Sequence, residues 1–379
     1  MTSPRLIRSL IAGLAFVALL AEGAQPGAAQ TAPYTITDLG TLGGPSSEAS
    51  GVNSAGQVVG ESEVRGGIFH AFSWPDPVTG MLQDLGTFGG SESAAFGINT
   101  TGQVTGYAEL SGGSAVHAFR WPDPTTGGLQ DLGTLPGGAG SVGEGLSPDG
   151  QVVGTADVPG GADHAFLWAA PGPMQDLGTL AGYPNSEATS INQAGQIVGF
   201  ASTTCPPDVD GPCTPRAFLW VSPGPMQNLG TLPGGSNSAA AAVNATGQVV
   251  GSADSAATPL HAFLWVAPGP MQDLGTLPGG ACSEASGING PGVVVGQSEV
   301  ALGTTPCTGT TDAFMWTASG GMVDLNTLID PTLGWQLTSA VGINDTGQIA
   351  GTGIINGQEH AFLMTPAGAA PTRRGVRRP

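Results

Sequence analysis

Hydrophobic residues in this chain alternate with small and polar residues in short runs, and the same runs return along the whole chain. Three segments recur in a constant order, with the forms DLGTL, INxxGQVVG and HAFLW. In an extended HAFLW segment, alternation places His, Phe and Trp on one side and Ala and Leu on the other. The QVVG-type segment is rich in β-branched residues, which favour strands. The pattern predicts a chain of short β-strands.

The repeat occurs in seven copies, spaced by 45 to 52 residues. The DLGTL-type segments begin at Asp38, Asp84, Asp131, Asp176, Asn228, Asp273 and Asp324. The HAFLW-type segments begin at His70, His117, His164, Arg216, His261, Asp312 and His360. The asparagine of INxxGQ is Asn53, Asn99, Asn192, Asn244, Asn289 or Asn344, with Ser147 in the third copy. Such a period indicates a repeat architecture.

Each copy predicts four antiparallel strands, which is the size of a β-propeller blade. The NxxGQ segment fits a type I turn between the first two strands, with asparagine first and glycine fourth. A parallel β-helix is the alternative, but its rungs are usually shorter. A lone fourth strand, residues 34–42, precedes the first copy, and the last copy lacks its own. We therefore predict an all-β, seven-bladed β-propeller, closed by an N-terminal strand that completes the last blade.

The two ends of the chain predict segments outside this ring. Residues 1–29 have the form of a signal peptide: Arg5 and Arg8 precede an apolar run at 10–21, and small residues precede Gln30. That run is shorter than the ~20 residues a membrane-spanning helix needs. The predicted organisation is a signal peptide at 1–29, a propeller at 30–366 and a disordered basic tail at 367–379. We expect a secreted monomer, extracellular or periplasmic, without a membrane span after cleavage.

The charge of the chain limits its possible binding partners, and its cysteines indicate disulfide bonds. The chain has 9 basic residues, all arginine, against 28 acidic ones, so a phosphate backbone would be repelled and nucleic-acid binding is not expected. A cationic ligand, a metal ion or a neutral glycan remains compatible. Four cysteines in an exported chain suggest two disulfides. The short segment between Cys205 and Cys213 favours their pairing, which leaves Cys282 to pair with Cys307.

The combined motifs resemble the extracellular HAF-repeat family, over residues 34–365. The tripeptide HAF, together with DLGTL and INxxGQVVG, carries this resemblance, while Arg216 and Asp312 replace the histidine and Met364 replaces the final tryptophan. The resemblance implies an exported bacterial repeat protein and no particular enzyme activity. The hairpin after Trp74 is also similar to the turn of kelch-type blades.

The repeated histidines invite a catalytic or metal-binding interpretation, which a ring of blades opposes because equivalent positions cannot converge on one ion. We predict instead a structural role for His70, His117, His164, His261 and His360. Six residues before each INxxGQ asparagine position stands a hydroxyl: Ser47, Ser93, Ser141, Ser186, Ser238, Ser283 and Thr338. We expect the imidazole to bond a hydroxyl or a backbone group there. The repeated tryptophans are expected to pack between blades.

A few irregular residues remain as candidates for binding. Glu48, Glu187 and Glu284 follow the repeated serine, where innermost strands would bring them to one mouth of the central channel. We expect no cofactor, although together these carboxylates could hold a divalent cation such as calcium. Trp335 lies outside the repeat and is a candidate ligand contact, as are Asp208 and Asp210 in the segment between Cys205 and Cys213.

Two functions follow from this pattern. The first is a secreted, non-enzymatic scaffold that binds an extracellular protein or glycan through the loops after the second and fourth strands, which emerge on one face. The inserts after Ala201 and Val300 make blades four and six the expected contact sites. The alternative is a propeller lyase or hydrolase acting on a glycan or peptide. It would need repeat-breaking residues such as Arg216, Asp312 and Glu144 to converge at a channel mouth.

Overall fold

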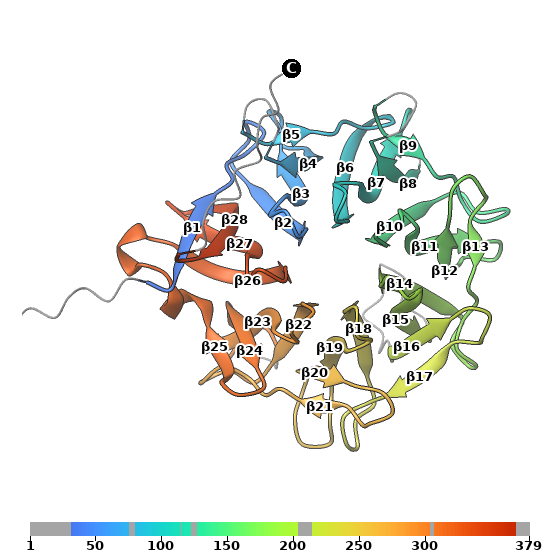
Figure 1. The fold of residues 1–379 in the computed structure, drawn as a ribbon. Coiled ribbons are helices and arrows are strands. Elements are labelled where there is room, and N and C mark those ends of the chain that lie inside the picture. Colours follow the sequence, from blue (N-terminus) through green and yellow to red (C-terminus); the bar gives the residue numbers. More distant parts are fainter. Residues whose placement is uncertain are drawn as a thin grey trace, which may run out of the picture. The chain divides into compact units, whose positions relative to one another are not determined.

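The computed structural model describes residues 32–75, 80–113, 115–122, 127–203, 214–303 and 307–368. These residues form seven four-stranded antiparallel sheets, set around a common centre as the blades of a β-propeller (Figure 1), which confirms the predicted fold. Among them, no helix is long and apolar enough to cross a membrane. The predicted signal peptide and nearly all of the predicted basic tail lie outside the described residues.

Each blade is built outward from the channel. The innermost strands are β2 (Ser47–Val52), β6 (Gly89–Ile98), β10 (Ser141–Leu146), β14 (Asn185–Ile191), β18 (Ser238–Val243), β22 (Ser283–Ile288) and β26 (Gln336–Ile343). The second strands are β3 (Val58–Glu63), β7 (Val104–Leu110), β11 (Val152–Val158), β15 (Gln196–Ser202), β19 (Val249–Ala253), β23 (Val294–Ala301) and β27 (Ile349–Ile355). The third are β4 (Phe69–Trp74), β8 (Val116–Trp121), β12 (Ala162–Trp168), β16 (Arg216–Val221), β20 (His261–Trp265), β24 (Thr310–Thr317) and β28 (Gln358–Pro366). The outermost are β5 (Gln83–Asp84), β9 (Gln130–Asp131), β13 (Gln175–Asp176), β17 (Gln227–Gly230), β21 (Gln272–Asp273), β25 (Gly321–Asp324) and β1 (Tyr34–Asp38).

Strand β1 closes the ring. It is the outermost strand of the seventh blade and pairs antiparallel with β28, from Tyr34 opposite Pro366 to Asp38 opposite Phe362. Strands β1 and β28 therefore lie in one sheet (Figure 1), so the ring has no open edge between its first and last blades. The predicted closure is confirmed.

The outermost strands are shorter than the DLGTL motif predicts, and most contain only its Gln-Asp start. In the first blade, the Asp84 carboxylate accepts the N–H of Gly86 at 2.8 Å. Gly86 has φ +79°, a conformation that only glycine adopts easily. The aspartate and glycine thus turn the chain out of the strand, and residues 85–88 connect to the next blade.

Apolar packing joins neighbouring blades. One core cluster sets Phe263 and Trp265 of the fifth blade against Ala217 and Leu219 of the fourth. The seven repeated phenylalanines are among the largest fully buried side chains: Phe72, Phe119, Phe166, Phe218, Phe263, Phe314 and Phe362. The Phe and Trp side of each HAFLW strand therefore packs against one neighbouring blade, and the Ala and Leu side packs against the other. The predicted role of the tryptophans in packing between blades is confirmed.

Every innermost strand carries a β-bulge. In β10, Gly143 pairs with Gly154 and Gly145 pairs with Val153, so Glu144 stands unpaired between them. The same register shift recurs in the other six blades. The glycine of each VVG-type second strand faces the bulge, and a Cβ on Gly251, for example, would clash with the carbonyl oxygen of Ala239. The bulge thus explains why glycine ends this motif.

The INxxGQ turns form a ring of hydrogen bonds between blades. The Asn53 Oδ1 accepts the N–H groups of Ala55 and Gln57 within its own turn, each at 3.0 Å. Its Nδ2 then donates to the backbone carbonyl of Asn99 in the next blade at 3.0 Å. Five further asparagines repeat this bond at 2.9–3.1 Å, and Asn344 donates back to Asn53. The sequence predicted only the turn, not this link.

Candidate functional site

The histidines bond a residue other than the predicted one. The Nδ1 of His164 lies 2.9 Å from a carboxylate oxygen of Asp176, the first residue of the DLGTL motif. The other four histidines make the same pair, at 2.9 Å in each case: His70–Asp84, His117–Asp131, His261–Asp273 and His360–Asp38. The expectation of a hydroxyl or backbone partner was wrong because β13 returns beside β12 with Asp176 opposite Phe166, two residues from His164, which brings the carboxylate within reach of the imidazole.

The repeated serine serves the neighbouring backbone instead. The Ser186 hydroxyl donates to the Gly178 carbonyl at 2.7 Å and accepts the Ala165 N–H at 2.9 Å. Since Ser186 belongs to the fourth blade and both partners to the third, the serine links two blades. The histidine, aspartate and serine are thus all occupied in the framework, as a structural role for the histidines requires.

The two replacements of histidine do not meet. The Arg216 Nη1 donates to the carbonyl oxygens of Pro215 and Ser236 on its own side of the ring. Asp312 lies beside Asp324, and burial followed by that neighbouring charge raises the pKa of Asp312. Gln336 donates a hydrogen bond to Asp312, whose buried Oδ1 has no partner among the described residues. Arg216 and Asp312 thus have separate neighbours, so the convergence that the enzyme hypothesis requires is not seen for this pair.

The bulge residues define a common tier of the central channel. They are Ser50, Phe96, Glu144, Thr189, Ala241, Ser286 and Val341, and all of them line one cavity of about 550 Å³. The innermost strands surround the centre of the ring (Figure 1). Because a bulge redirects the side chain of its extra residue, the same local irregularity brings seven side chains, of six types, to the channel. We call these residues the bulge ring.

Glu144 is the single charged residue of the bulge ring, and no other charged residue lines the described part of this cavity. Burial, followed by the charge of Glu187, raises the pKa of Glu144 to about 8. Its carboxylate makes no hydrogen bond or ion pair with any described residue. Gly143 and Gly145 flank it, and a Cβ on Gly145 would lie 2.9 Å from the Thr189 carbonyl oxygen. Glycines thus let the strands approach closely around an unpaired acid.

The three glutamates predicted at the channel mouth have separate neighbours. Glu284 accepts a hydrogen bond from the Gln297 Nε2 at 3.1 Å. Burial raises the pKa of Glu48, with a contribution from Glu359. Burial also raises the pKa of Glu187, with a contribution from Asp163. Within the described ranges no three His, Cys, Asp or Glu side chains form a group that could hold a metal ion.

Acidic residues at the ends of the second strands tie down the glycine loops. Glu109 accepts both the hydroxyl and the N–H of Ser91, at 2.7 and 2.6 Å, and these bonds lower the pKa of Glu109. Asp157 accepts the N–H groups of Ala139 and Gly140. Asp254 and Glu299 hold the equivalent loops. These loops all lie on the face where the innermost strands begin, which we call the loop face.

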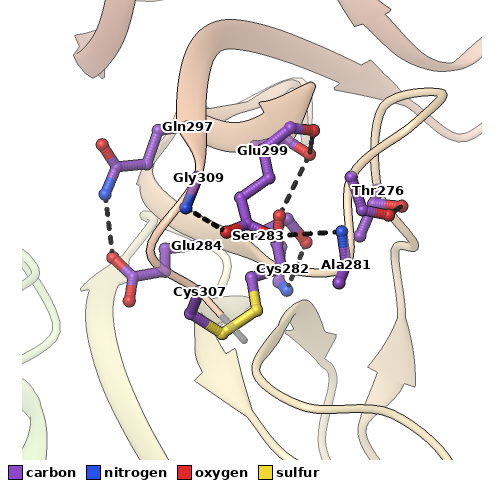
Figure 2. The surroundings of a disulfide bond; sticks show 12 residues. Thr276, Ala281, Cys282, Ser283, Glu284, Gln297, Glu299, Cys307 and Gly309 are labelled. Carbon is purple, nitrogen blue, oxygen red and sulfur yellow. Dashed lines mark hydrogen bonds between the residues drawn. A yellow bond between two sulfur atoms is a disulfide. The ribbon is translucent and has the colours of Figure 1, made fainter. Parts of the chain in front are cut away.

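The sixth blade carries an insert on the loop face (Figure 2). The disulfide between Cys282 and Cys307 joins the loop after β23 to the residue before β22, with Cα atoms 5.3 Å apart. The buried Glu299 carboxylate accepts the N–H of Ala281 at 3.1 Å and that of Gly309 at 2.7 Å. The predicted pairing of Cys282 with Cys307 is confirmed. Cys205, Cys213, Asp208 and Asp210 lie outside the described residues.

Trp335 is not the free surface residue that its place outside the repeat suggested. It is half-buried and packs against the apolar core between the sixth and seventh blades. Its ring meets that of Phe362 edge-on at 6.0 Å. The insert before β26 contains the short helices η1 (Leu325–Leu328) and η2 (Pro331–Leu333), and it folds back so that Trp335 covers the blade.

Exposed apolar side chains mark the loop face of blades six and seven. Leu302 is 70% exposed in the disulfide-bonded loop. Leu333, 48% exposed, ends η2, and Ile354, 39% exposed, lies near the end of β27. The other large exposed apolar residues, Met81, Val221 and Val266, belong to hairpins between third and outermost strands. Two adjoining blades thus present apolar side chains on the face that carries the inserts.

Sequence reasoning missed the bulge ring and the asparagine ring. Glu144 was noticed only as a residue that breaks the repeat, because a bulge leaves no composition signal of its own. Its signal was indirect: the second-strand glycine returns in all seven copies, although glycine is unfavourable inside a strand. That glycine marks the close approach of the bulged strand.

Comparisons with known proteins support the fold and no more. No family model and no curated protein matches the chain. Among solved structures, a prolyl endopeptidase matches with a TM-score of 0.54 and 10% identity over 85% of this chain and 50% of that one. BP39L lectin from Burkholderia pseudomallei matches with a TM-score of 0.46 and 12% identity, over 89% and 97%. TolB from Acinetobacter baumannii matches with a TM-score of 0.44 and 13% identity, and this chain spans 58% of the length of that protein.

Proposed function

We propose that this protein is a secreted, non-enzymatic scaffold of the HAF-repeat type, which binds an extracellular protein through the loop face of blades six and seven. The single observation that carries this proposal is the insert of the sixth blade. A disulfide and the Glu299 carboxylate hold that loop in place, while its Leu302 side chain is 70% exposed. Rigid loops on a regular scaffold are common recognition surfaces.

Several features favour a protein partner. Leu302, Leu333 and Ile354 are apolar side chains without aromatic rings, and such exposed residues are typical of protein interfaces. Export to an oxidising compartment agrees with the Cys282–Cys307 disulfide. A non-enzymatic role agrees with the framework contacts of the histidines. It also agrees with the separate neighbours of Arg216 and Asp312, which do not bring these two repeat-breaking positions together.

The experiment is a binding screen with the purified protein against extracellular proteins and glycans, followed by a matched pair of variants. Leu302→Ala removes an exposed side chain of the loop face, and Val266→Ala removes a similar one from a hairpin on the other side of the blades. For a protein ligand we expect Leu302→Ala to weaken binding about tenfold or more and Val266→Ala to leave it unchanged. Equal effects of the two variants, a glycan as the specific ligand, or turnover of the ligand would each overturn the proposal.

A further inference from the structure

The channel holds an acid whose environment is unfavourable for its charge. Glu144 lines a cavity of about 550 Å³ whose other described lining residues are uncharged. The Glu144 side chain is half-buried and borders the open channel, and a partly desolvated carboxylate without a partner is less favourable than one paired with a cation. Since no described residue bonds this carboxylate, its natural partner is a group that enters the channel. Binding in the channel does not depend on the proposed role of the loop face.

The surroundings of Glu144 indicate what kind of group fits. Phe96 is the bulge residue of the adjoining second blade and lines the same cavity. Strands β6 and β10 run close together there, because a Cβ on Gly97 would lie 3.0 Å from the Glu144 carbonyl oxygen. The Phe96 ring lies 5.8 Å from that of Tyr107 on the next strand of its blade. An aromatic ring and a carboxylate that line one cavity suit an organic cation, whose charge attracts the acid and whose methyl or methylene groups contact the ring.

The remainder of the channel also favours an organic cation as the ligand. Below the bulge ring lies an apolar wall, which this cavity shares with a second cavity of about 380 Å³. The wall consists of Val52, Ile98, Leu146, Ile191 and Val243. Glu144 and Glu187 would both repel an anion. The charge of Glu187 already acts on Glu144 and raises its pKa. A bare metal ion would find one carboxylate where such ions require several ligands. An alkylammonium group needs one carboxylate and an apolar wall.

We propose that the channel binds a small organic cation, an alkylammonium group, which pairs with the carboxylate of Glu144 and rests against Phe96. Glu48, Glu187 and Glu284 each stand two residues before a bulge residue, toward the loop face, and their negative potential attracts a cation to this entrance. The ligand therefore enters from the loop face and stops at the bulge ring, above the apolar wall.

The test uses the full mature chain, with choline as the cationic probe and 3,3-dimethyl-1-butanol as its uncharged analogue of the same shape. Calorimetry and thermal unfolding measure binding to the native protein, to Glu144→Gln and to Phe96→Leu. We expect choline, and not the alcohol, to bind and raise the melting temperature. Glu144→Gln should weaken choline binding at least about tenfold. Phe96→Leu should weaken it less, because this change removes only the contact with the ring.

Two controls separate the site from general attraction. Glu284→Gln removes a charge at the entrance and should reduce choline binding less than Glu144→Gln, with an effect that disappears at high salt. Affinity in the native protein should rise from about pH 6 to about pH 9, as Glu144 loses its proton, and stay flat in Glu144→Gln. Glu187, which faces Glu144, is present in both proteins and cancels in this comparison. Equal binding of choline and the alcohol, equal binding to Glu144→Gln, or no binding of choline and tetramethylammonium would overturn the proposal.

Discussion

Two rings of residues surround the same channel and differ in almost every respect. The asparagine ring at the INxxGQ turns is nearly uniform, and six asparagines make the same bond to the next blade. The bulge ring sits on a backbone just as regular but carries seven side chains of six different types. The first ring holds blades together through identity, whereas the second offers varied chemistry at equivalent positions. Regular backbone thus supports both framework and site.

The largest expected effect breaks the backbone on which the bulge ring depends. In Gly251→Ala, the new Cβ would clash with the carbonyl oxygen of Ala239, which cannot move without disturbing the sheet. We expect a loss of about 3 kcal/mol or more in the free energy of unfolding. Ser252→Ala, the next residue in β19, is the matched control and should cost less than about 1 kcal/mol. Equal tolerance of both changes in urea unfolding would show that the bulge is not rigidly required.

The next largest loss of stability is expected when one hydrogen bond of the asparagine ring is removed. The Asn192 Nδ2 donates to the carbonyl of Asn244 in the next blade at 2.9 Å, and its Oδ1 accepts two N–H groups. Asn192→Ala leaves these buried groups unsatisfied and should cost about 2–3 kcal/mol in urea unfolding. A cost no larger than that of an exposed turn residue such as Gln193→Ala would contradict the role of this ring.

The third prediction completes the asparagine ring. Ser147 occupies the asparagine position in the third blade, where its hydroxyl accepts the N–H of Gln151 at 3.0 Å. It makes no side-chain hydrogen bond to the fourth blade among the described residues. Ser147→Asn restores the amide that the other six turns use and should gain about 1 kcal/mol. Thermal unfolding measures the change, and a loss of stability would show that the third turn has a different geometry.

The smallest effect concerns the histidines. The Nδ1 of His164 lies 2.9 Å from Asp176, but the Asp176 side chain is 43% exposed, so solvent screens the pair. We expect His164→Ala to cost only about 0.5–1 kcal/mol, less than Ser186→Ala, which removes two buried backbone contacts between blades. The opposite order in denaturant titrations would place the histidine at the centre of the framework.

The fold could be predicted because its signals repeat. The period, the strand alternation and the displaced N-terminal strand each appear in the sequence, and together they fixed blade number and closure. The partner of the histidines could not be predicted so easily, since His164 and Asp176 come together only through the tight return of β13 beside β12. Glu144 could not be placed for a similar reason. Its direction depends on a bulge whose trace in the sequence is a glycine in the opposite strand.

We infer that the asparagine ring stabilises the propeller, whereas Glu144 serves the proposed ligand at the expense of stability. The native pKa of Glu144 is raised from 4.5 to about 8, so the folded state binds its proton more tightly than the unfolded state. Stability is therefore lost as pH rises through this range, and Glu144→Gln avoids that loss. Because the carboxylate borders an open channel, we expect a gain of about 1 kcal/mol, part of the full linkage energy.

The most direct measurement is unfolding of Glu144→Gln, Asn192→Ala and the native protein, without ligand, at about pH 9 and about pH 4. At the higher pH the account predicts opposite signs: Glu144→Gln is more stable than the native protein and Asn192→Ala is less stable. At the lower pH the gain of Glu144→Gln disappears, and the loss of Asn192→Ala remains. If Glu144→Gln is instead destabilised at about pH 9, Glu144 belongs to the framework, and the proposed division between the two rings is wrong.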